Sequence, residues 1–249
     1  MFLFSVSIFV IYIFQDYYPH FIFSIFSNTI CPVISGFAVV TASFSLERYW
    51  RGSKSPFAKI WLYLISGLFL WFLGETSWGV YTLIFGVELP YPSVADVFWI
   101  GGYIPLFIGY FTYVMIFRKA LTLKMIAKSL IISAITTIIV IVTVLLPILT
   151  WEENLVTLIL DFAYPLLDIL LLSILLIGIN IFWGGRLKIP WLLMVSALST
   201  NVCADAAFSY TTAQGTYYPG HLLDAFYFVS YVLMYVAYIV AMHVHMKEF

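Results

Sequence analysis

Long apolar runs, separated by short polar stretches, dominate the pattern along this chain. A helix needs about 20 apolar residues to cross the hydrocarbon core of a bilayer, and seven runs have that length. They cover about 21–46, 60–86, 94–117, 129–149, 155–182, 190–210 and 221–245. An eighth run, Met1–Phe14, is shorter and crosses only if it tilts or if the bilayer thins around it. Because it lacks a basic start and a small-residue cleavage site, a retained first helix is favoured over a signal peptide.

The pattern therefore predicts an all-α fold, a polytopic transmembrane helical bundle with eight spans, or seven if Met1–Phe14 does not cross. Residues 1–249 form one transmembrane domain in this prediction. Runs this long and continuous are not typical of a barrel, and lipid accepts only helices or closed barrels as spanning structures.

Charged residues in the loops predict which way the helices run. All 11 Lys and Arg residues follow even-numbered spans, whereas Asp16, Glu88, Glu152 and Glu153 occupy the opposite loops without any basic residue. The positive-inside rule places the basic side in the cytoplasm, so we expect a cell-membrane protein with a cytoplasmic C-terminus. Aromatic residues near span ends fit interfacial belts: Tyr49, Trp50, Trp61, Tyr91, Trp151, Trp183, Trp191, Tyr217 and Tyr218.

Composition supports a lipid environment and excludes several other classes. Hydrophobic residues make up 63% of the chain and charged residues 9%, with a mean hydropathy of +1.05, whereas a soluble domain has about a quarter charged residues. The near-neutral charge balance disfavours a nucleic-acid partner. Cys31 and Cys203 both lie inside apolar runs, which argues against a disulfide scaffold or a zinc finger.

Six of the 12 acidic residues fall within the predicted spans: Glu75, Asp96, Asp161, Asp168, Asp205 and Asp224. Placing a charge at membrane depth costs about 2.5–3.5 kcal/mol even on insertion scales. No Lys or Arg lies in any predicted span, so none of these acids can form an intramembrane ion pair. Each must be protonated, hydrogen-bonded to a neutral partner, hydrated or bound to a cation.

With the orientation above, these acids lie in the outer half of the bundle, and His221 lies at the mouth of the last span. We therefore expect an outward-facing acidic cavity shared by several helices and lined by these seven residues. In an alternative interpretation, Asp96, Asp205 and Asp224 only cap helix ends near the interface, where Asp is favoured.

Two hairpins share a spacing of aromatic residues. From both Asp96 and Asp224, aromatics follow at +2, +3, +7 and +14. Positions 0, +3, +7 and +14 lie on one helix face, where hydroxyls can bond to the carboxyl. Four aromatics are expected to support the site: Trp99, Tyr103, Tyr164 and Tyr231.

Simple packing explains the aromatic positions equally well. The matched residues lie about 130 positions apart, which suggests a duplicated four-helix unit of the kind seen in repeat-built membrane proteins. Pro105 and Pro165 inside spans predict kinks, which in membrane helices often lie beside cavities.

Three segments, YPSVADVFWIGGY (91–103), LDFAYPLLDILLL (160–172) and YYPGHLLDAFYFVSYVL (217–233), carry a resemblance. In this order they resemble the multi-pass N-terminal membrane region that precedes PAS, histidine-kinase and diguanylate-cyclase modules in archaeal and bacterial signalling proteins. The resemblance extends from about Tyr17 to Tyr238. It implies an input domain that senses something at or within the membrane. No output module follows in these 249 residues, so we expect either a free-standing relative of such regions or a protein that works through a separate cytoplasmic signalling partner.

Several cofactor chemistries are disfavoured. Retinal needs a Lys within a span, and none is present. Haem needs axial ligands on facing helices, whereas His243 and His245 lie at one end of one span. Gly184-Gly185 is a turn and not a phosphate loop. The sequence does not identify a cofactor, a ligand or an oligomeric state.

Two alternatives to a sensor use the same acids. A membrane metallohydrolase could hold a divalent cation with carboxylates and His221 or His20, although catalytic zinc usually has two or three histidines. A proton- or cation-coupled transporter fits unpaired intramembrane acids, but no inner-half acid completes a route. The sensor interpretation does not require catalytic activity. In it, binding of a ligand, proton or cation in the cavity changes helix packing, and the last helix transmits the change towards His243–Lys247.

Overall fold

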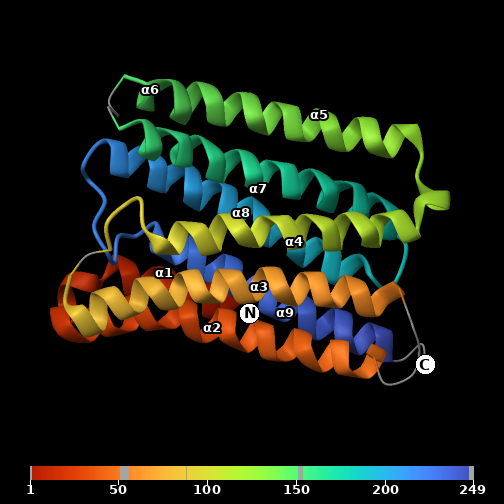
Figure 1. The fold of residues 1–249 in the computed structure, drawn as a ribbon, viewed down its shortest axis with the longest axis horizontal. Helices are drawn as coiled ribbons and strands as arrows, with labels where there is room; N and C mark the ends of the chain where they lie inside the picture. Colours follow the sequence, from red (N-terminus) through yellow and green to blue (C-terminus); the bar gives the residue numbers. More distant parts are fainter. Residues whose placement is uncertain (1, 51–55, 88, 151–153, 247–249) are drawn as a thin grey trace.

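A computed structural model describes residues 2–50, 56–87, 89–150 and 154–246, and these form only helices, turns and loops (Figure 1). The α-helices are α1 (Phe2–Ile13), α2 (His20–Trp50), α3 (Pro56–Val80), α4 (Val94–Ile116), α5 (Leu123–Val140), α6 (Leu146–Ile148), α7 (Leu155–Phe182), α8 (Lys188–Ala213) and α9 (Asp224–Met246). Two π-helical turns, Tyr81–Phe85 and Ile141–Leu145, extend α3 and α5.

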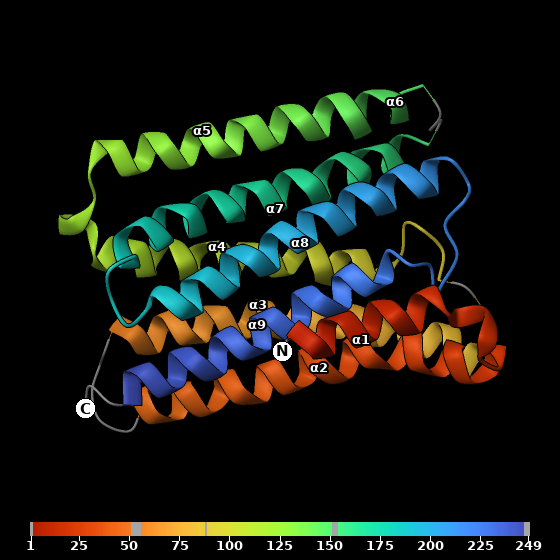
Figure 2. The same cartoon turned by 180° about the vertical axis from the view of Figure 1, so that it is seen from behind.

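Seven helices are long and apolar enough to cross a membrane, and they correspond to the seven strong apolar runs. The protein is therefore a multi-pass membrane protein. Helix α1 has 12 residues and rises about 18 Å, short of a hydrocarbon core of about 30 Å. It starts near the middle of the assembly and ends beside the start of α2 (Figure 2). The described residues thus form seven full-length helices, the lower of the two predicted counts, and a shorter α1 beside them.

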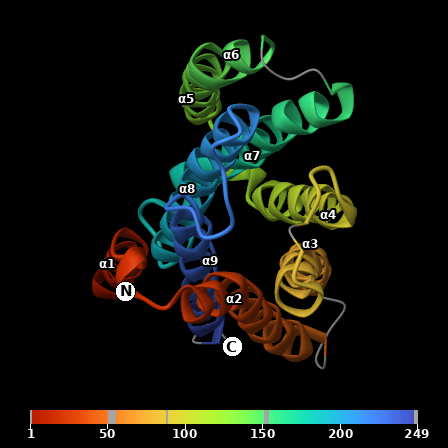
Figure 3. The ribbon, with the colours of Figure 1, turned by 90° about the vertical axis from the view of Figure 1, so that its left-hand side faces the viewer.

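Six of these helices form a closed ring. Neighbouring contacts run from α2 to α3, α4, α7, α8 and α9, and α9 contacts α2 again. Figure 3 views this six-helix ring from one end. Helix α5 packs outside the ring against α7, and α1 packs against α9.

One end of the ring carries the basic residues. Helices α2, α4, α7 and α9 finish where α3, α5 and α8 begin, on the right of Figure 1. We call this the basic end, because Lys59, Arg118, Lys119, Lys124, Lys128, Arg186 and Lys188 lie within or beside the helix termini there. Arg48 is in the last turn of α2, its side chain outside the description, and Arg51, Lys54 and Lys247 lie outside the described residues. The predicted clustering is confirmed for the residues described, whereas a cytoplasmic location of this end stays a prediction.

Close packing of small and aromatic residues joins the helices near the basic end. The Phe182 ring lies 4.9 Å from Phe117 and 5.0 Å from Trp191, between ring centroids. A Cβ added to Gly178 would overlap the Trp191 ring, so glycine lets α8 approach α7 here. Small residues with close backbones are typical of membrane helix interfaces, where lipid supplies no hydrophobic driving force.

The prediction of interfacial belts was wrong for four aromatics. Trp61 and Trp191 are 3% and 5% exposed and lie in the core, because their rings fill space between ring helices instead of facing lipid headgroups. Tyr91 and Tyr217 line a cavity described below. Trp183 and Tyr218 are exposed, as predicted. Trp151 and the side chains of Tyr49 and Trp50 lie outside the part of the chain that the structure describes.

Candidate ligand-binding cavity

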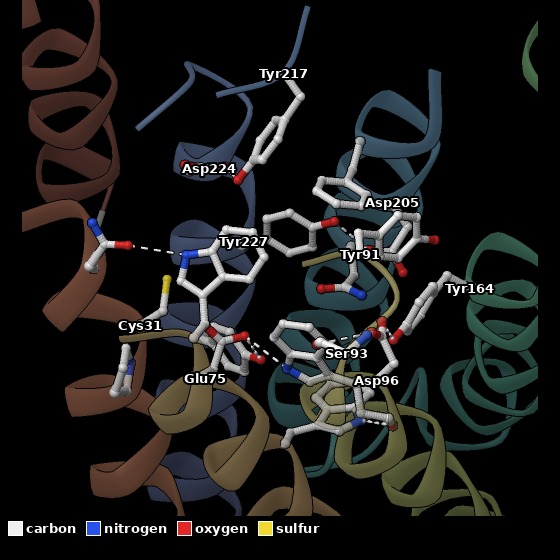
Figure 4. Close-up of a pocket in the computed structure, with 18 of the residues that line it drawn as sticks. Cys31, Glu75, Tyr91, Ser93, Asp96, Tyr164, Asp205, Tyr217, Asp224 and Tyr227 are labelled. Atoms are coloured by element: carbon white, nitrogen blue, oxygen red, sulfur yellow. Dashed lines mark hydrogen bonds between the residues drawn. The ribbon is translucent and has the colours of Figure 1, made fainter. Parts of the chain in front are cut away.

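The end of the six-helix ring opposite the basic end contains a cavity of about 1000 Å³, including its opening (Figure 4). All six ring helices and the loops before α4 and α9 contribute to its wall. Its carboxyls are Glu75, Asp96, Asp205 and Asp224, and its rings are Trp71, Trp78, Tyr91, Trp99, Tyr103, Tyr164, Phe208, Tyr217, Tyr227 and Tyr231.

Glu75 on α3 connects three helices. Its Oε1 accepts hydrogen bonds from Trp99 Nε1 of α4 at 3.2 Å and from the Tyr231 hydroxyl of α9 at 2.7 Å. The side chain is partly exposed although it lies within the ring, and it lines the cavity. Its donors are neutral side chains, so Glu75 is positioned without a cationic partner among them.

Asp205 on α8 lines the cavity and is only 6% exposed. Its Oδ1 accepts from the Tyr227 hydroxyl at 2.6 Å. Its Oδ2 is buried and receives no hydrogen bond at acceptable geometry from the described residues.

Asp168 on α7 lies one layer behind the cavity wall, fully buried. The Tyr103 hydroxyl donates to Oδ1 at 2.6 Å, and Asn201 Nδ2 donates to Oδ2 at 3.0 Å. Because buried polar groups must be satisfied internally in lipid, Tyr103 and Asn201 allow this acid to lie between helices. The predicted role of Asp168 as a wall residue is corrected to a buried partner of the wall.

Asp96 and Asp224 lie at the starts of α4 and α9, as the capping alternative expected. Asp96 accepts from Ser93 N at 2.6 Å in a capping box, and its other oxygen accepts from the Tyr164 hydroxyl at 2.6 Å. Asp224 accepts from Gly220 N at 2.8 Å and from the Tyr217 hydroxyl at 3.2 Å. Asp96 therefore takes part in capping α4, whereas Asp224 ties the start of α9 to the preceding turn, and both line the cavity.

Asp161 and His221 do not line the cavity. Asp161 is fully buried and accepts from the Tyr91 hydroxyl at 2.8 Å. It shares one face of α7 with Asp168, and only the longer Tyr164 between them reaches the cavity. His221 lies in the turn before α9, where its Nδ1 accepts from Leu223 N at 3.2 Å and its ring stacks edge-on against Tyr218. These contacts of His221 are therefore with residues of its own turn.

The four aromatics expected to support the acids, Trp99, Tyr103, Tyr164 and Tyr231, all line the cavity. The sequence prediction missed several other residues. Tyr91 and Tyr217 approach from loops and donate to Asp161 and Asp224. Burial raises the pKa of both phenols, which keeps them protonated as donors.

Asn28 and Trp78 were also missed. The Trp78 indole donates to Asn28 Oδ1 at 3.1 Å across α3 and α2. The available signal was weak: Asn28 and Pro32 echo the spacing of Asp161 and Pro165 in a polar break of an apolar run.

A metal site is not formed by the acids that the structure describes. Among those residues, no group of three or more His, Cys, Asp or Glu side chains could hold a metal ion. His20, considered as a ligand from the sequence, is exposed at the start of α2. The four carboxyls of the wall come from α3, α4, α8 and α9, and each is oriented by its own donors.

Comparison with known proteins assigns no family. No family model matches the chain, and neither a curated protein nor a solved structure matches it. The resemblance to membrane input regions of signalling proteins therefore stays a prediction, and the function must be argued from the cavity itself.

Proposed function

We propose that this protein is a membrane-embedded sensor whose cavity binds a ligand and whose helix ends at the basic end transmit the occupancy. The observation that carries this proposal is that all six ring helices contribute to one acidic cavity. A ligand there touches every helix of the ring, so it can favour one packing arrangement over another. We infer that the cavity end faces the exterior and the basic end the cytoplasm.

Helix α9 is the element best suited to carry the change. It begins at the cavity with Asp224, and Tyr231 binds Glu75 two turns further along. Nearer the basic end, the Tyr238 hydroxyl lies 2.8 Å from the Tyr110 hydroxyl of α4. A shift of α9 at the cavity would therefore alter its contacts near Tyr238.

An internal duplication accompanies this proposal. The Trp99–Glu75 and Tyr227–Asp205 bonds join equivalent positions of the two proposed units, and Tyr110 and Tyr238, 128 residues apart, meet each other. The ring order of α2, α3 and α4 repeats in α7, α8 and α9. With two similar units around one cavity, a single ligand could contact both units and change their packing.

Transport is the second candidate, because a smaller pocket lies near the basic end. It has about 450 Å³ of space and is lined by residues including Trp61, Tyr110, Trp191 and Tyr238. No carboxyl is among the described residues of its wall, whereas coupled transport uses ionisable groups along the pathway. A sensor therefore fits the distribution of acids better.

The proposal can be tested without knowing the ligand, by filling the cavity. Ser27 lines the cavity on α2 and Thr29 does not, so Ser27→Trp fills it and Thr29→Trp is the matched control. Spin labels at Lys59→Cys and His243→Cys, both exposed near the basic end, report the α3–α9 distance in nanodiscs. Exposed Cys203 is replaced by Ala to prevent its labelling.

We expect Ser27→Trp to change the measured distance distribution and Thr29→Trp to leave it as in the parent. Identical distributions in all three proteins would show that the cavity is not coupled to the basic end. That result would contradict a sensor role.

A further inference from the structure

Two of the four cavity carboxyls lack any backbone compensation. Asp96 accepts a backbone N–H at the start of α4 and Asp224 accepts one from the turn before α9. The described donors to Glu75 and Asp205 are neutral side chains. Asp205 is 6% exposed, and its Oδ2 receives no donor from the described residues. Burying a carboxylate without a cation is costly. A positively charged occupant would therefore be stabilised at this pair.

Glu75 and Asp205 lie on α3 and α8, on different sides of the ring, and both line the cavity. No Lys, Arg or His is among the described wall residues. A cation in the cavity would supply the counter-charge that these wall residues do not provide.

The rest of the wall is aromatic. Ring centroids of Trp78 and Trp99 lie 6.3 Å apart, those of Trp78 and Tyr217 6.3 Å, and those of Tyr217 and Phe208 4.8 Å. These four rings form a continuous surface from α4 through α3 to α8. Aromatic faces attract organic cations, and ligand ammonium groups are commonly recognised by such surfaces.

This combination selects among cations. Calcium and magnesium need several oxygen ligands around one point, and the described residues form no group of three or more His, Cys, Asp or Glu side chains for such an ion. A proton makes no use of the aromatic faces that line the cavity. An organic ammonium ion matches both the carboxyl pair and the rings.

We propose that the cavity binds a small organic ammonium ion, with Glu75 and Asp205 as its counter-charges and Trp78 and Trp99 against its apolar groups. The inference rests on the proposed ligand-binding role of this cavity and adds the chemical class of its ligand. It covers primary and quaternary ammonium groups, which the experiment distinguishes.

The experiment is calorimetric titration of the protein in nanodiscs with ethanolamine, choline and phenyltrimethylammonium. Dimethylbutanol, the uncharged carbon isostere of choline, controls for shape, and calcium chloride tests an inorganic cation. We expect at least one ammonium probe to bind and to exceed the uncharged isostere by about 10-fold or more in affinity.

Glu75→Gln and Asp205→Asn keep side-chain shape and an acceptor oxygen for the Tyr and Trp donors. Each is expected to weaken ammonium binding by about 10-fold or more. Asp16→Asn, at an exposed acid outside the cavity, makes the same charge change and should have no effect. If the carboxyl variants do not fold, Trp78→Leu replaces them and should weaken ammonium binding by about 2- to 30-fold.

The ligand class is overturned if no ammonium probe binds, if dimethylbutanol or calcium binds equally well, or if binding survives these cavity substitutions. The outcome is distinguishable from failure of the sensor role. A basic-end distance that responds to Ser27→Trp without ammonium binding would contradict only the ligand class. Ammonium binding that leaves the Lys59–His243 distance unchanged would contradict only the sensor role.

Discussion

The two halves of the six-helix ring are built from the same helices but are held together differently. In the cavity half, carboxyls on one helix accept from Tyr and Trp donors on another, as Asp168 does from Tyr103 at 2.6 Å. In the basic half, the described contacts are mainly ring against ring, as between Phe182 and Trp191 at 5.0 Å. Membrane helices can associate through either kind of contact. Hydrogen bonds between side chains therefore join the helices around the cavity, whereas aromatic packing joins them near the basic end.

The largest expected effect is that of Asp168→Leu in the cavity half. The substitution leaves the Tyr103 hydroxyl and the Asn201 amide without their acceptor, and each stranded buried group costs about 1–3 kcal/mol. We expect a loss of about 2–6 kcal/mol in the free energy of unfolding, measured by denaturant titration in mixed micelles. Asp168→Asn keeps an acceptor for Tyr103 and should cost much less. Equal losses would show that hydrogen bonding does not hold this half together.

Gly178→Ala tests the basic half. The added methyl would overlap the Trp191 ring, and overpacking of this kind costs about 1–3 kcal/mol. Gly184→Ala is the control, because nothing lies within 4 Å of its added Cβ. Thermal unfolding in detergent should separate the two variants, while any ligand affinity of the cavity should not change. A change in ligand affinity with Gly178→Ala would contradict the division between the halves.

The hydrogen bond between Tyr110 and Tyr238 is expected to contribute less to stability than the contacts above, because it joins two neutral hydroxyls in an otherwise aromatic region. Tyr110→Phe or Tyr238→Phe should each cost about 0.5–1.5 kcal/mol of stability. The double substitution should cost less than the sum, because no lone hydroxyl is left buried. Additive losses in this double-mutant cycle would mean that the two hydroxyls do not depend on each other.

The smallest expected effect is at the surface of the basic end. Lys188 Nζ lies 4.1 Å from the centroid of the Trp183 ring, an exposed contact worth about 0.5–1 kcal/mol. Lys188→Met should lower the melting temperature slightly, whereas Lys124→Met, at another exposed lysine, should not. If both lysine variants melt alike, the ring contact adds nothing to stability.

Much of the fold could be predicted because a membrane helix is encoded locally. The seven apolar runs became seven long helices. The errors lie at the ends: α5 begins at Leu123, ahead of the run that starts near residue 129, and includes Lys124 and Lys128. Lysines at helix ends can extend their charge into the interface. Helix α9 starts at Asp224 instead of 221, because Gly220 adopts a positive φ of 91° in the preceding turn.

The site could be predicted only in part. Glu75, Asp96, Asp205 and Asp224 line the cavity, and their isolation in apolar runs was the signal that identified them. Asp161 and Asp168 gave the same signal but lie behind the wall. Residue spacing shows which side chains share a helix face, but it does not show which neighbouring helix covers that face. Tyr91 and Tyr217 fit the sequence pattern of an interfacial belt, but in the structure their loops place both side chains at the cavity.

The length of the apolar runs, the one-sided basic residues and the absence of Lys and Arg partners for the buried acids are properties of the sequence alone. They follow from the cost of exposing a backbone or a charge to lipid, which acts on each segment separately. The closure of six helices into a ring, and the choice of which carboxyl oxygens face donors and which face the cavity, were decided by the tertiary structure. These depend on side chains far apart in the chain, such as Tyr231 and Glu75, 156 residues apart, meeting at hydrogen-bonding distance.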